Sequence, residues 1–472
     1  MSHSIPPPIG NRASVSASVT PSGTPSGTPS GTPGTPAGDP DRLLTRALGV
    51  RSLAATIFNY TVGSGIFVLP ALVVAQLDGA APLAYLVCAL VMALVVLVFA
   101  EAGSRVSTTG GPYAYIETAL GPLPGFVAGV LLSTTDLAAT GAIAMLLAQS
   151  LARLVGTSGP LWPAAIVTLL VTSLAAINIR GLRWGARLVE LCTVAKLLPL
   201  LFFVLVGAAF MSPVNLQWRT LPTVSTVART AGTLLFAFAG IEAALIPSGE
   251  VRDSARTVPR AAMLALAAAT LLYLAVQTVA LGVLGPRLAD DTVAPLARAA
   301  GTFAGRGGFV LLLVGASVSM FGWLTGALLA GPRALFALAR DGFLPARMAS
   351  VHPRFHTPHV AIAVYAALTL ALALSGTFEH LAVLSNLAAL ALYALSAIAA
   401  RVLRQRGIRG EGAPFRMPGG ATVPLLTCLV VAWVVVNTIT RREFVAFGVL
   451  LAASALVYMS RRRRPETATA RS

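Results

Sequence analysis

The chain is divided into about twelve apolar stretches, each long enough to cross a lipid bilayer as a helix. A helix rises 1.5 Å per residue, so a hydrocarbon layer of about 30 Å takes about 20 residues to cross. In lipid the backbone must satisfy its own hydrogen bonds, and stretches of this length do so as helices. They lie at 53–77, 80–103, 121–150, 160–179, 185–210, 225–248, 261–285, 303–339, 358–376, 379–401, 420–440 and 442–460. The sequence therefore predicts an all-α, polytopic membrane protein.

Composition agrees with this interpretation. Hydrophobic residues make up 56% of the 472 residues and charged residues 11%, and the mean hydropathy is +0.80. A soluble protein of this composition would aggregate. The formal net charge of +17 would suit a nucleic-acid-binding protein, but the arginines form short clusters between the apolar stretches. We therefore expect the lipid bilayer, and no nucleic acid, as a partner of this chain.

The arginines predict the orientation in the membrane. With a cytoplasmic N-terminus and twelve spans, 23 arginines fall in loops or tails on the inside and eight on the outside. Because cytoplasmic loops carry an excess of basic residues, both termini are expected on the cytoplasmic side. The predicted location is the cytoplasmic membrane of the cell.

Four segments follow from these patterns. Residues 1–41 are rich in Pro, Ser, Gly and Thr and predict a disordered cytoplasmic tail without a cleavable signal peptide. Residues 42–401 hold ten of the spans and form the expected core of the protein. Residues 402–460 add two further helices, and 461–472 form a basic cytoplasmic tail.

Two spans are interrupted at corresponding places. The first contains TVGSGIF, Thr61 to Phe67, and the sixth contains FAFAGIEAALIPSGE, Phe236 to Glu250. Spans one to five and six to ten are therefore expected to form a five-plus-five inverted repeat with broken helices 1 and 6. A break exposes N–H groups on one half-helix and C=O groups on the other, which suits a zwitterion. The alternative is that the glycines only allow close helix packing.

Four segments together resemble the amino acid–polyamine–organocation (APC) transporters, and in particular their proton-coupled amino acid permeases. They are TVGSGIF, AEAGSRVSTTGGPYAYIETALGP, FAFAGIEAALIPSGEVRDSARTVPRA and PRALFALARDGFLP. The resemblance covers roughly residues 48 to 460, in the right order. It implies a leucine-transporter-like fold with two extra C-terminal helices and alternating access around a site at mid-membrane.

The resemblance also implies a substrate site. The carboxylate would be bound by N–H groups of the first break and by a serine hydroxyl, in the segment Gly63, Ser64, Gly65 and Ile66. The ammonium would be bound by carbonyl oxygens of Thr61, Phe236, Ala237 and Ala239. Phe236 and Phe238 are candidate lids over the substrate, or they contact lipid or core.

Lys196 is the only lysine among the 34 basic Lys and Arg residues, and it lies in the fifth span. An ammonium at bilayer depth costs roughly 2.5 to 3.5 kcal/mol on insertion scales. The context ELCTVAKLLPL resembles the TxxKLxPL segment of proton-coupled relatives. We expect Lys196 to bridge a carbonyl near Gly63 and a hydroxyl, Ser317 or Ser319, and to release that bridge on deprotonation. The alternative is a permanent pair with Asp136 or Glu190.

Other charged and aromatic residues are candidates for proton coupling or for gates. Glu242 matches an acidic position that the family uses in proton coupling, with a structural cap of backbone N–H groups as the alternative. Asp136 lies at depth in the third span, but the sequence does not indicate its face. Candidate gate residues are Tyr113 and Tyr115, which would equally suit the membrane interface, and Trp323 of the eighth span.

These patterns predict a secondary active transporter of amino acids or related amines, with proton symport as its leading mode. The alternative is an exchanger of amino acids or polyamines, and a sensor or a membrane enzyme is less favoured because no output domain or catalytic arrangement is visible. We expect no enzymatic activity, no cofactor and no metal site. Neutral substrates are slightly favoured, and the oligomeric state is left open.

Overall fold

The computed structural model describes residues 49–106, 110–157, 159–180, 185–218, 221–245, 251–340, 342–410, 412–438 and 440–462. The predicted tail 1–41 and all but the first two residues of the tail 461–472 lie outside this part of the chain. The described residues belong to one unit that begins at Leu44.

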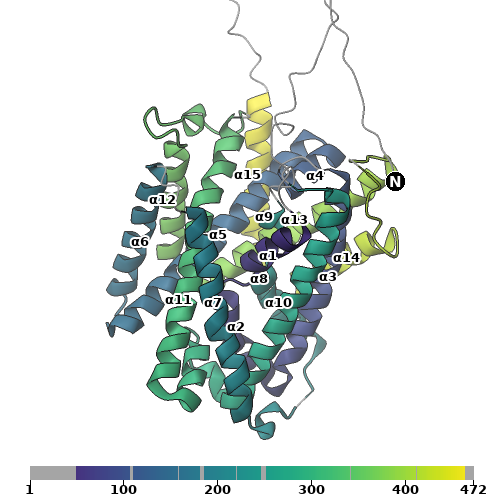
Figure 1. Ribbon diagram of the computed structural model, residues 1–472. Coiled ribbons are helices and arrows are strands. Elements are labelled where there is room, and N and C mark those ends of the chain that lie inside the picture. The colour runs from purple at the N-terminus through teal and green to yellow at the C-terminus, as the bar shows by residue number, and fades with distance from the viewer. Residues whose placement is uncertain are drawn as a thin grey trace, which may run out of the picture. The chain divides into compact units, whose positions relative to one another are not determined.

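Every regular element in the described residues is a helix (Figure 1). The α-helices are α1 (Val50–Thr61), α2 (Gly65–Leu77), α3 (Ala81–Arg105), α4 (Pro112–Leu120), α5 (Pro122–Val155), α6 (Leu161–Ile179), α7 (Gly185–Gly207), α8 (Val224–Phe238), α9 (Ile241–Ala244), α10 (Ser254–Leu284), α11 (Pro295–Arg340), α12 (His359–Ser375), α13 (Phe378–Gln405), α14 (Thr422–Thr438) and α15 (Arg441–Arg462). Six helical stretches are long and apolar enough to cross a membrane, and shorter apolar helices account for further predicted spans. The prediction of an all-α polytopic membrane protein is confirmed.

The predicted breaks in the first and sixth spans are also present. The first predicted stretch is shared by α1 and α2, and the sixth by α8 and α9. Helices of the first half lie beside their counterparts in the second half: α2 beside α8, α3 beside α10, and α5 beside α11. These pairs join the first span to the sixth, the second to the seventh and the third to the eighth, as a five-plus-five repeat predicts.

Local sequence explains where α5 begins and ends. Gly121 adopts φ +95°, and Pro122 follows at the first helical position, where its missing N–H costs nothing. The helix ends at Gly156 in the left-handed conformation, whose N–H bonds the carbonyls of Ala152 and Arg153. This 34-residue helix supplies one wall of the cavity described below.

A proline and a glycine set the close approach of α7 and α11, which lie side by side. A Cβ atom added to Gly315 would lie 2.3 Å from Cγ of Pro199. The ring of Pro199 therefore occupies space that any larger residue at 315 would fill. This contact fixes the part of α7 that carries Lys196, three residues before the proline.

Two segments add detail to the predicted boundaries. Residues around Tyr113, which precede the predicted third span, form the separate helix α4. In α11, Gly305 has φ +58°, so the residues from Pro295 form a short helical piece before the span itself.

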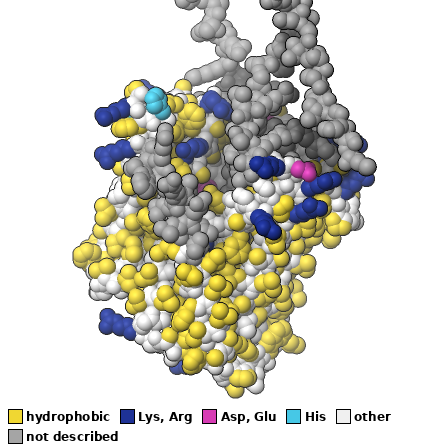
Figure 2. Space-filling view, viewed as in Figure 1, with side chains coloured by type: hydrophobic (Ala, Val, Ile, Leu, Met, Phe, Trp, Pro, Cys, Tyr) yellow, Lys and Arg dark blue, Asp and Glu magenta, His cyan; other side chains and the backbone are white. Residues whose placement is uncertain are grey.

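Polarity is distributed unevenly over the surface. Figure 2 shows hydrophobic side chains over most of the body and Lys and Arg side chains gathered mainly at the end that is uppermost in the view. Such a division is typical of a protein whose body faces lipid and whose charged loops face water.

Candidate substrate cavity between the broken helices

The two helix breaks lie against each other in the interior. Val62, with ψ +75°, ends α1, and Ala239, with ψ +156°, ends α8. Gly240 then takes φ +112°, a backbone conformation that residues with a side chain rarely adopt. A Cβ atom on Gly240 would lie 2.9 Å from the carbonyl oxygen of Tyr60. The glycine therefore allows both the turn and the contact between the breaks.

A second glycine, Gly65, allows the start of α2 to lie close to the end of α8. A Cβ atom on Gly65, the first residue of α2, would lie 2.8 Å from Cα of Ala237 in α8. Backbone atoms cannot yield as a flexible side chain can. The start of α2 and the end of α8 are therefore held at a distance that only glycine permits.

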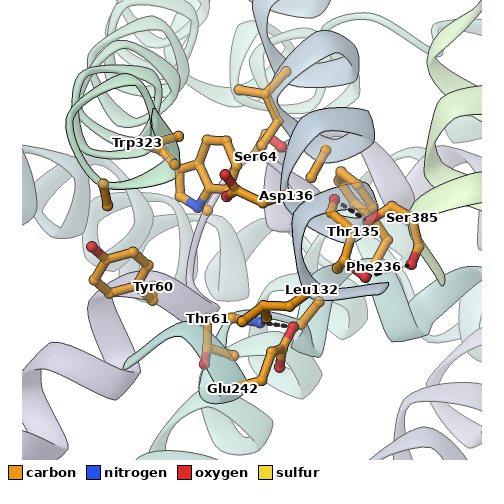
Figure 3. A pocket seen from close by; sticks show the side chains of 18 of the residues that line it. Tyr60, Thr61, Ser64, Leu132, Thr135, Asp136, Phe236, Glu242, Trp323 and Ser385 are labelled. Carbon is orange, nitrogen blue, oxygen red and sulfur yellow. Dashed lines mark hydrogen bonds between the residues drawn. The ribbon is translucent and has the colours of Figure 1, made fainter. Parts of the chain in front are cut away.

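A cavity opens between these breaks and the helices α5, α11 and α13 (Figure 3). Its volume is about 110 Å³. One water needs roughly 10 to 15 Å³ by this measure, so a solute of several heavy atoms fits. The lining residues are Tyr60, Thr61, Gly63, Ser64, Gly65, Leu132, Ser133, Thr135, Asp136, Ala139, Ile143, Phe236, Ala239, Gly240, Glu242, Trp323, Ala327, Ala330, Gly331, Ala334 and Ser385.

The start of α2 presents hydrogen-bond donors to this cavity. The first N–H groups of a helix have no acceptor within the helix. In α2 these include the N–H groups of Gly65 and Ile66. The Ser64 hydroxyl lines the cavity, and no described residue hydrogen-bonds to it although it is buried. A hydroxyl and backbone donors at a helix N-terminus can together bind an anion.

The ends of α1 and α8 share one hydroxyl group. The Oη of Tyr273, in α10, lies 2.7 Å from the carbonyl oxygen of Thr61 and 2.6 Å from that of Ala237. Both oxygens were expected to bind the substrate ammonium. Tyr273 already donates to this pair, so a bound amine must either displace it or use the other carbonyls of the breaks.

Two carboxylates line the cavity. Glu242 is buried, and its Oε1 accepts the Gly240 N–H at 3.1 Å while its Oε2 accepts the Tyr393 hydroxyl at 3.1 Å. This is the cap of a freed N–H group that we considered as its structural role, and it places Glu242 at the second break. Asp136 is partly exposed, and its Oδ2 accepts a hydrogen bond from the Tyr365 hydroxyl of α12.

Lys196 lies behind the first break rather than on the cavity wall. Its Nζ lies 2.8 Å from the Asn59 carbonyl oxygen, 2.6 Å from Asn59 Oδ1 and 2.6 Å from the Val62 carbonyl oxygen. All three acceptors belong to the last turn and the end of α1. The ammonium therefore holds the carbonyls that the break leaves without helical partners.

Comparison with known proteins identifies the family of this chain. A family model described as "Amino acid permease" matches residues 48–459. The chain belongs to the amino acid permease family. This result confirms the resemblance found in the sequence.

Three curated proteins of Bacillus subtilis (strain 168) are similar to this permease over most of its length. A methylthioribose transporter is 28% identical over 453 residues, which covers 89% of this chain and 94% of the transporter. The serine/threonine exchanger SteT is 29% identical, covering 82% of this chain and 89% of the exchanger. The branched-chain amino acid permease BcaP is 26% identical, covering 84% and 89% respectively.

The structure divides the predicted substrate residues of the permease into two groups. Six of them line the cavity: Thr61, Gly63, Ser64, Gly65, Phe236 and Ala239. The side chains of the other three lie behind its wall: Ile66, Ala237 and Phe238. Phe238 packs edge-on against Tyr273, with ring centroids 4.9 Å apart, and Phe236 packs in the same way against Phe378 at 5.3 Å. Of the two candidate lids, only Phe236 reaches the cavity.

The candidate gate residues are spread more widely. Trp323 lines the cavity. Tyr113 and Tyr115 lie on α4, apart from the cavity lining, and Tyr115 is fully buried. Ser317 donates to the Leu313 carbonyl within its own helix. Ser319 donates to the Gly63 carbonyl at 3.4 Å, so this serine reaches the first break directly.

Several lining residues were not predicted, although the sequence contains a signal for them. On α5 the cavity is lined at positions 132, 133, 135, 136, 139 and 143, and on α11 at 323, 327, 330, 331 and 334. Apart from the neighbouring pairs, the positions in both series are two to four residues apart, so each helix turns one broad face to the cavity. The α11 series is small except for its tryptophan, which is a pattern that leaves space beside a helix. No cluster of potential metal-binding side chains occurs in the described part of the chain.

Proposed function

We propose that this permease moves an amino acid or a related amine across the cytoplasmic membrane by alternating access. The observation that carries the proposal is the position of the cavity, which lies where the two broken helices meet. Backbone groups without helical partners gather there, and the rest of the wall is largely apolar. Such a site binds a small zwitterion through its backbone at mid-membrane.

The proposed binding mode uses the polarity of the break. The substrate carboxylate accepts hydrogen bonds from the Gly65 and Ile66 N–H groups and from the Ser64 hydroxyl. The free hydroxyl of Ser64 supports this mode, because a buried donor without a partner costs about 1 to 3 kcal/mol until a ligand satisfies it. The substrate ammonium faces the carbonyl ends of α1 and α8.

We further propose that transport is driven by proton symport through Lys196. Three oxygen atoms of the described residues lie within hydrogen-bond distance of the Lys196 Nζ. A charged ammonium has three N–H donors, whereas the neutral amine has two. Loss of the proton would therefore release one carbonyl or amide oxygen at the end of α1. Such a release would loosen the first break and couple protonation to movement of α1. Glu242 is a second candidate for proton coupling, through its bond to the N–H of the other break.

Exchange of one amino acid for another is the alternative mode. SteT, which is similar to this chain, is named as a serine/threonine exchanger. Glu242 and Trp323 both line the cavity, as expected if they matter more than Lys196 in an exchanger. A sensor or a membrane enzyme remains less favoured, because a closed bundle with a central cavity fits transport best.

The proposed orientation places both termini in the cytoplasm. Arginines of the described residues are concentrated at one end of the body, as in Figure 2, and this end is the proposed cytoplasmic face. Residues 42–401 form the proposed transport core, with 402–460 as an accessory pair of helices.

Transport by purified protein in liposomes tests the function and its mode. A symporter accumulates substrate when only a pH gradient, acidic outside, is imposed. An exchanger takes up labelled substrate only when unlabelled substrate is preloaded. Absence of both responses for all common amino acids and amines would contradict the proposed function.

A further inference from the structure

The charges around the cavity are not balanced. Of the residues that line it, Asp136 and Glu242 are acidic, and the lining contains no Lys, Arg or His. The ammonium of Lys196 lies behind the first break. Among the described residues at this site, two carboxylates therefore face one cation, which leaves one negative charge in excess.

The two carboxylates differ in what already binds them. Both oxygens of Glu242 accept hydrogen bonds from the protein, and its side chain is 2% exposed. Asp136 accepts a hydrogen bond from Tyr365 at Oδ2 only, and no described residue donates to its Oδ1. In the view of Figure 3, Asp136 is drawn near Ser64 and Trp323, and Glu242 near Thr61. Of the two carboxylates, Asp136 is thus the one with an oxygen to which no described residue donates.

The surroundings hold Asp136 in this position. The Tyr365 hydroxyl that donates to Asp136 also lies 2.9 Å from the hydroxyl of Thr140, one turn further along α5. A Cβ atom on Gly331 of α11 would lie 2.5 Å from Asp136 Oδ2 and 2.4 Å from the Tyr365 ring. The pair therefore occupies a recess that exists because residue 331 has no side chain. Such a recess places the carboxylate against the cavity instead of against lipid.

An ionised carboxylate in a membrane interior is costly unless a cation accompanies it. The part of the chain that the structure describes supplies one hydroxyl to Asp136 and no positive group at hydrogen-bond distance. We infer that the substrate supplies it: the permease carries an amino acid with a positively charged side chain, and Asp136 binds that charge. This inference rests on the proposed transport function, and it replaces the slight preference for neutral substrates expected from sequence.

A matched pair of ligands tests the inference. Arginine and citrulline have nearly the same shape, but only arginine carries a cationic side chain. Dissociation constants of both are measured on the purified full-length protein, and transport of both by counterflow in liposomes. We expect the wild-type protein to bind arginine at least about tenfold more tightly than citrulline, as expected for a charge-assisted pair in a buried site.

Asp136→Asn keeps the shape and an acceptor for Tyr365 but removes the charge. In this variant the preference for arginine over citrulline is expected to fall to about twofold or less. In Glu242→Gln the ratio of the two dissociation constants is expected to stay near its wild-type value, because Glu242 is already satisfied by the protein.

The outcomes separate this inference from the proposed function. Wild-type protein that binds citrulline as tightly as arginine, or that transports only neutral amino acids, would overturn the inference and leave the transport function in place. This measurement needs no variant, so it holds even if Asp136→Asn does not fold. Protein that neither binds nor exchanges any amino acid or amine would overturn the proposed function itself.

Discussion

The ammonium of Lys196 lies 2.6 Å from the carbonyl oxygen of Val62, the residue that ends α1. A side chain of α7, in the fifth span, thus donates a hydrogen bond to the end of α1, in the first span. The last carbonyl of the broken helix is therefore bonded to a side chain of another helix instead of to a backbone N–H group.

Substitution of Lys196 tests this relationship. In Lys196→Ala the Asn59 and Val62 oxygens lose their shared donor, and uptake driven by a pH gradient is expected to fall at least about tenfold, while substrate binding changes far less. Lys196→Arg is the matched control, because arginine retains donors but does not deprotonate at these pH values. Its uptake should become insensitive to the pH gradient. Unchanged proton-driven uptake in Lys196→Ala would rule out this coupling.

The contact of Gly65 with Ala237 predicts a second effect. In Gly65→Ala the new methyl group would lie 2.8 Å from the Cα atom of Ala237, so α2 and α8 must separate and the cavity must change shape. We expect substrate affinity to fall by at least about tenfold, which corresponds to 1.4 kcal/mol. Gly326→Ala serves as the control on α11, because nothing lies within 4 Å of its added Cβ. Equal affinities of the two variants would show that the close approach is not needed for binding.

Substitution of Glu101 is expected to change the stability of the fold rather than substrate binding. Its Oε1 accepts from Arg105 at 2.9 Å, and both of its oxygens accept from Arg404 of α13. The Met417 N–H, before α14, donates to Oε2 at 3.1 Å. Because Glu101 is fully buried, Glu101→Gln should lower the free energy of unfolding by about 3 to 5 kcal/mol.

Thermal unfolding in detergent measures this effect. Asp253→Asn is the control, since its pair with Arg256 spans 3.8 Å and the side chains are 54% and 76% exposed. Such a surface pair contributes about 0 to 1 kcal/mol. A midpoint of Glu101→Gln equal to that of the control would show that the cluster does not stabilise the fold.

Asp291 predicts a dependence of stability on pH. Burial alone would raise the pKa of Asp291, but the Ala294 N–H, the Arg153 guanidinium and the Val293 N–H outweigh burial and hold this pKa below its ordinary value. Its carboxylate therefore stabilises the fold above the ordinary pKa of about 3.9 and loses this contribution as the pH falls through the lower folded value.

Unfolding midpoints of wild type and Asp291→Asn are compared across pH. The wild type should be more stable by a constant amount above about pH 4, and this advantage should shrink at lower pH. Asp290→Asn, whose carboxylate pairs with Arg298 at 3.3 Å on an exposed surface, should leave the midpoint nearly unchanged. An advantage that does not depend on pH would contradict the role of the charge.

The helices, their breaks and the cavity residues at the breaks were largely predictable, whereas most of the residues that α5 and α11 supply to the cavity were not. Apolar length fixes where the chain crosses the membrane, and the glycines of TVGSGIF and FAFAGIE mark positions where a helix is costly. The side of α5 that faces the cavity depends on its rotation against α11 and α12. Only the contacts of Asp136 with Tyr365 and Gly331 establish it.

Tyr273 illustrates the same limit. It is a single aromatic residue in an apolar run, and nothing nearby in the sequence marks it as polar in function. Its role arises because α10 brings its hydroxyl to two carbonyls that are 176 residues apart in the chain, Thr61 and Ala237. Contacts of this kind depend on tertiary structure alone.

The hydroxyl of Tyr273 carries one proton for these two acceptors. The O–H bond can therefore point to the end of α1 or to the end of α8, and a small rotation about the C–O bond turns it from one carbonyl oxygen to the other. The last turns of the two half-helices thus compete for a single donor, so a full hydrogen bond to one carbonyl leaves the other in need of a second donor.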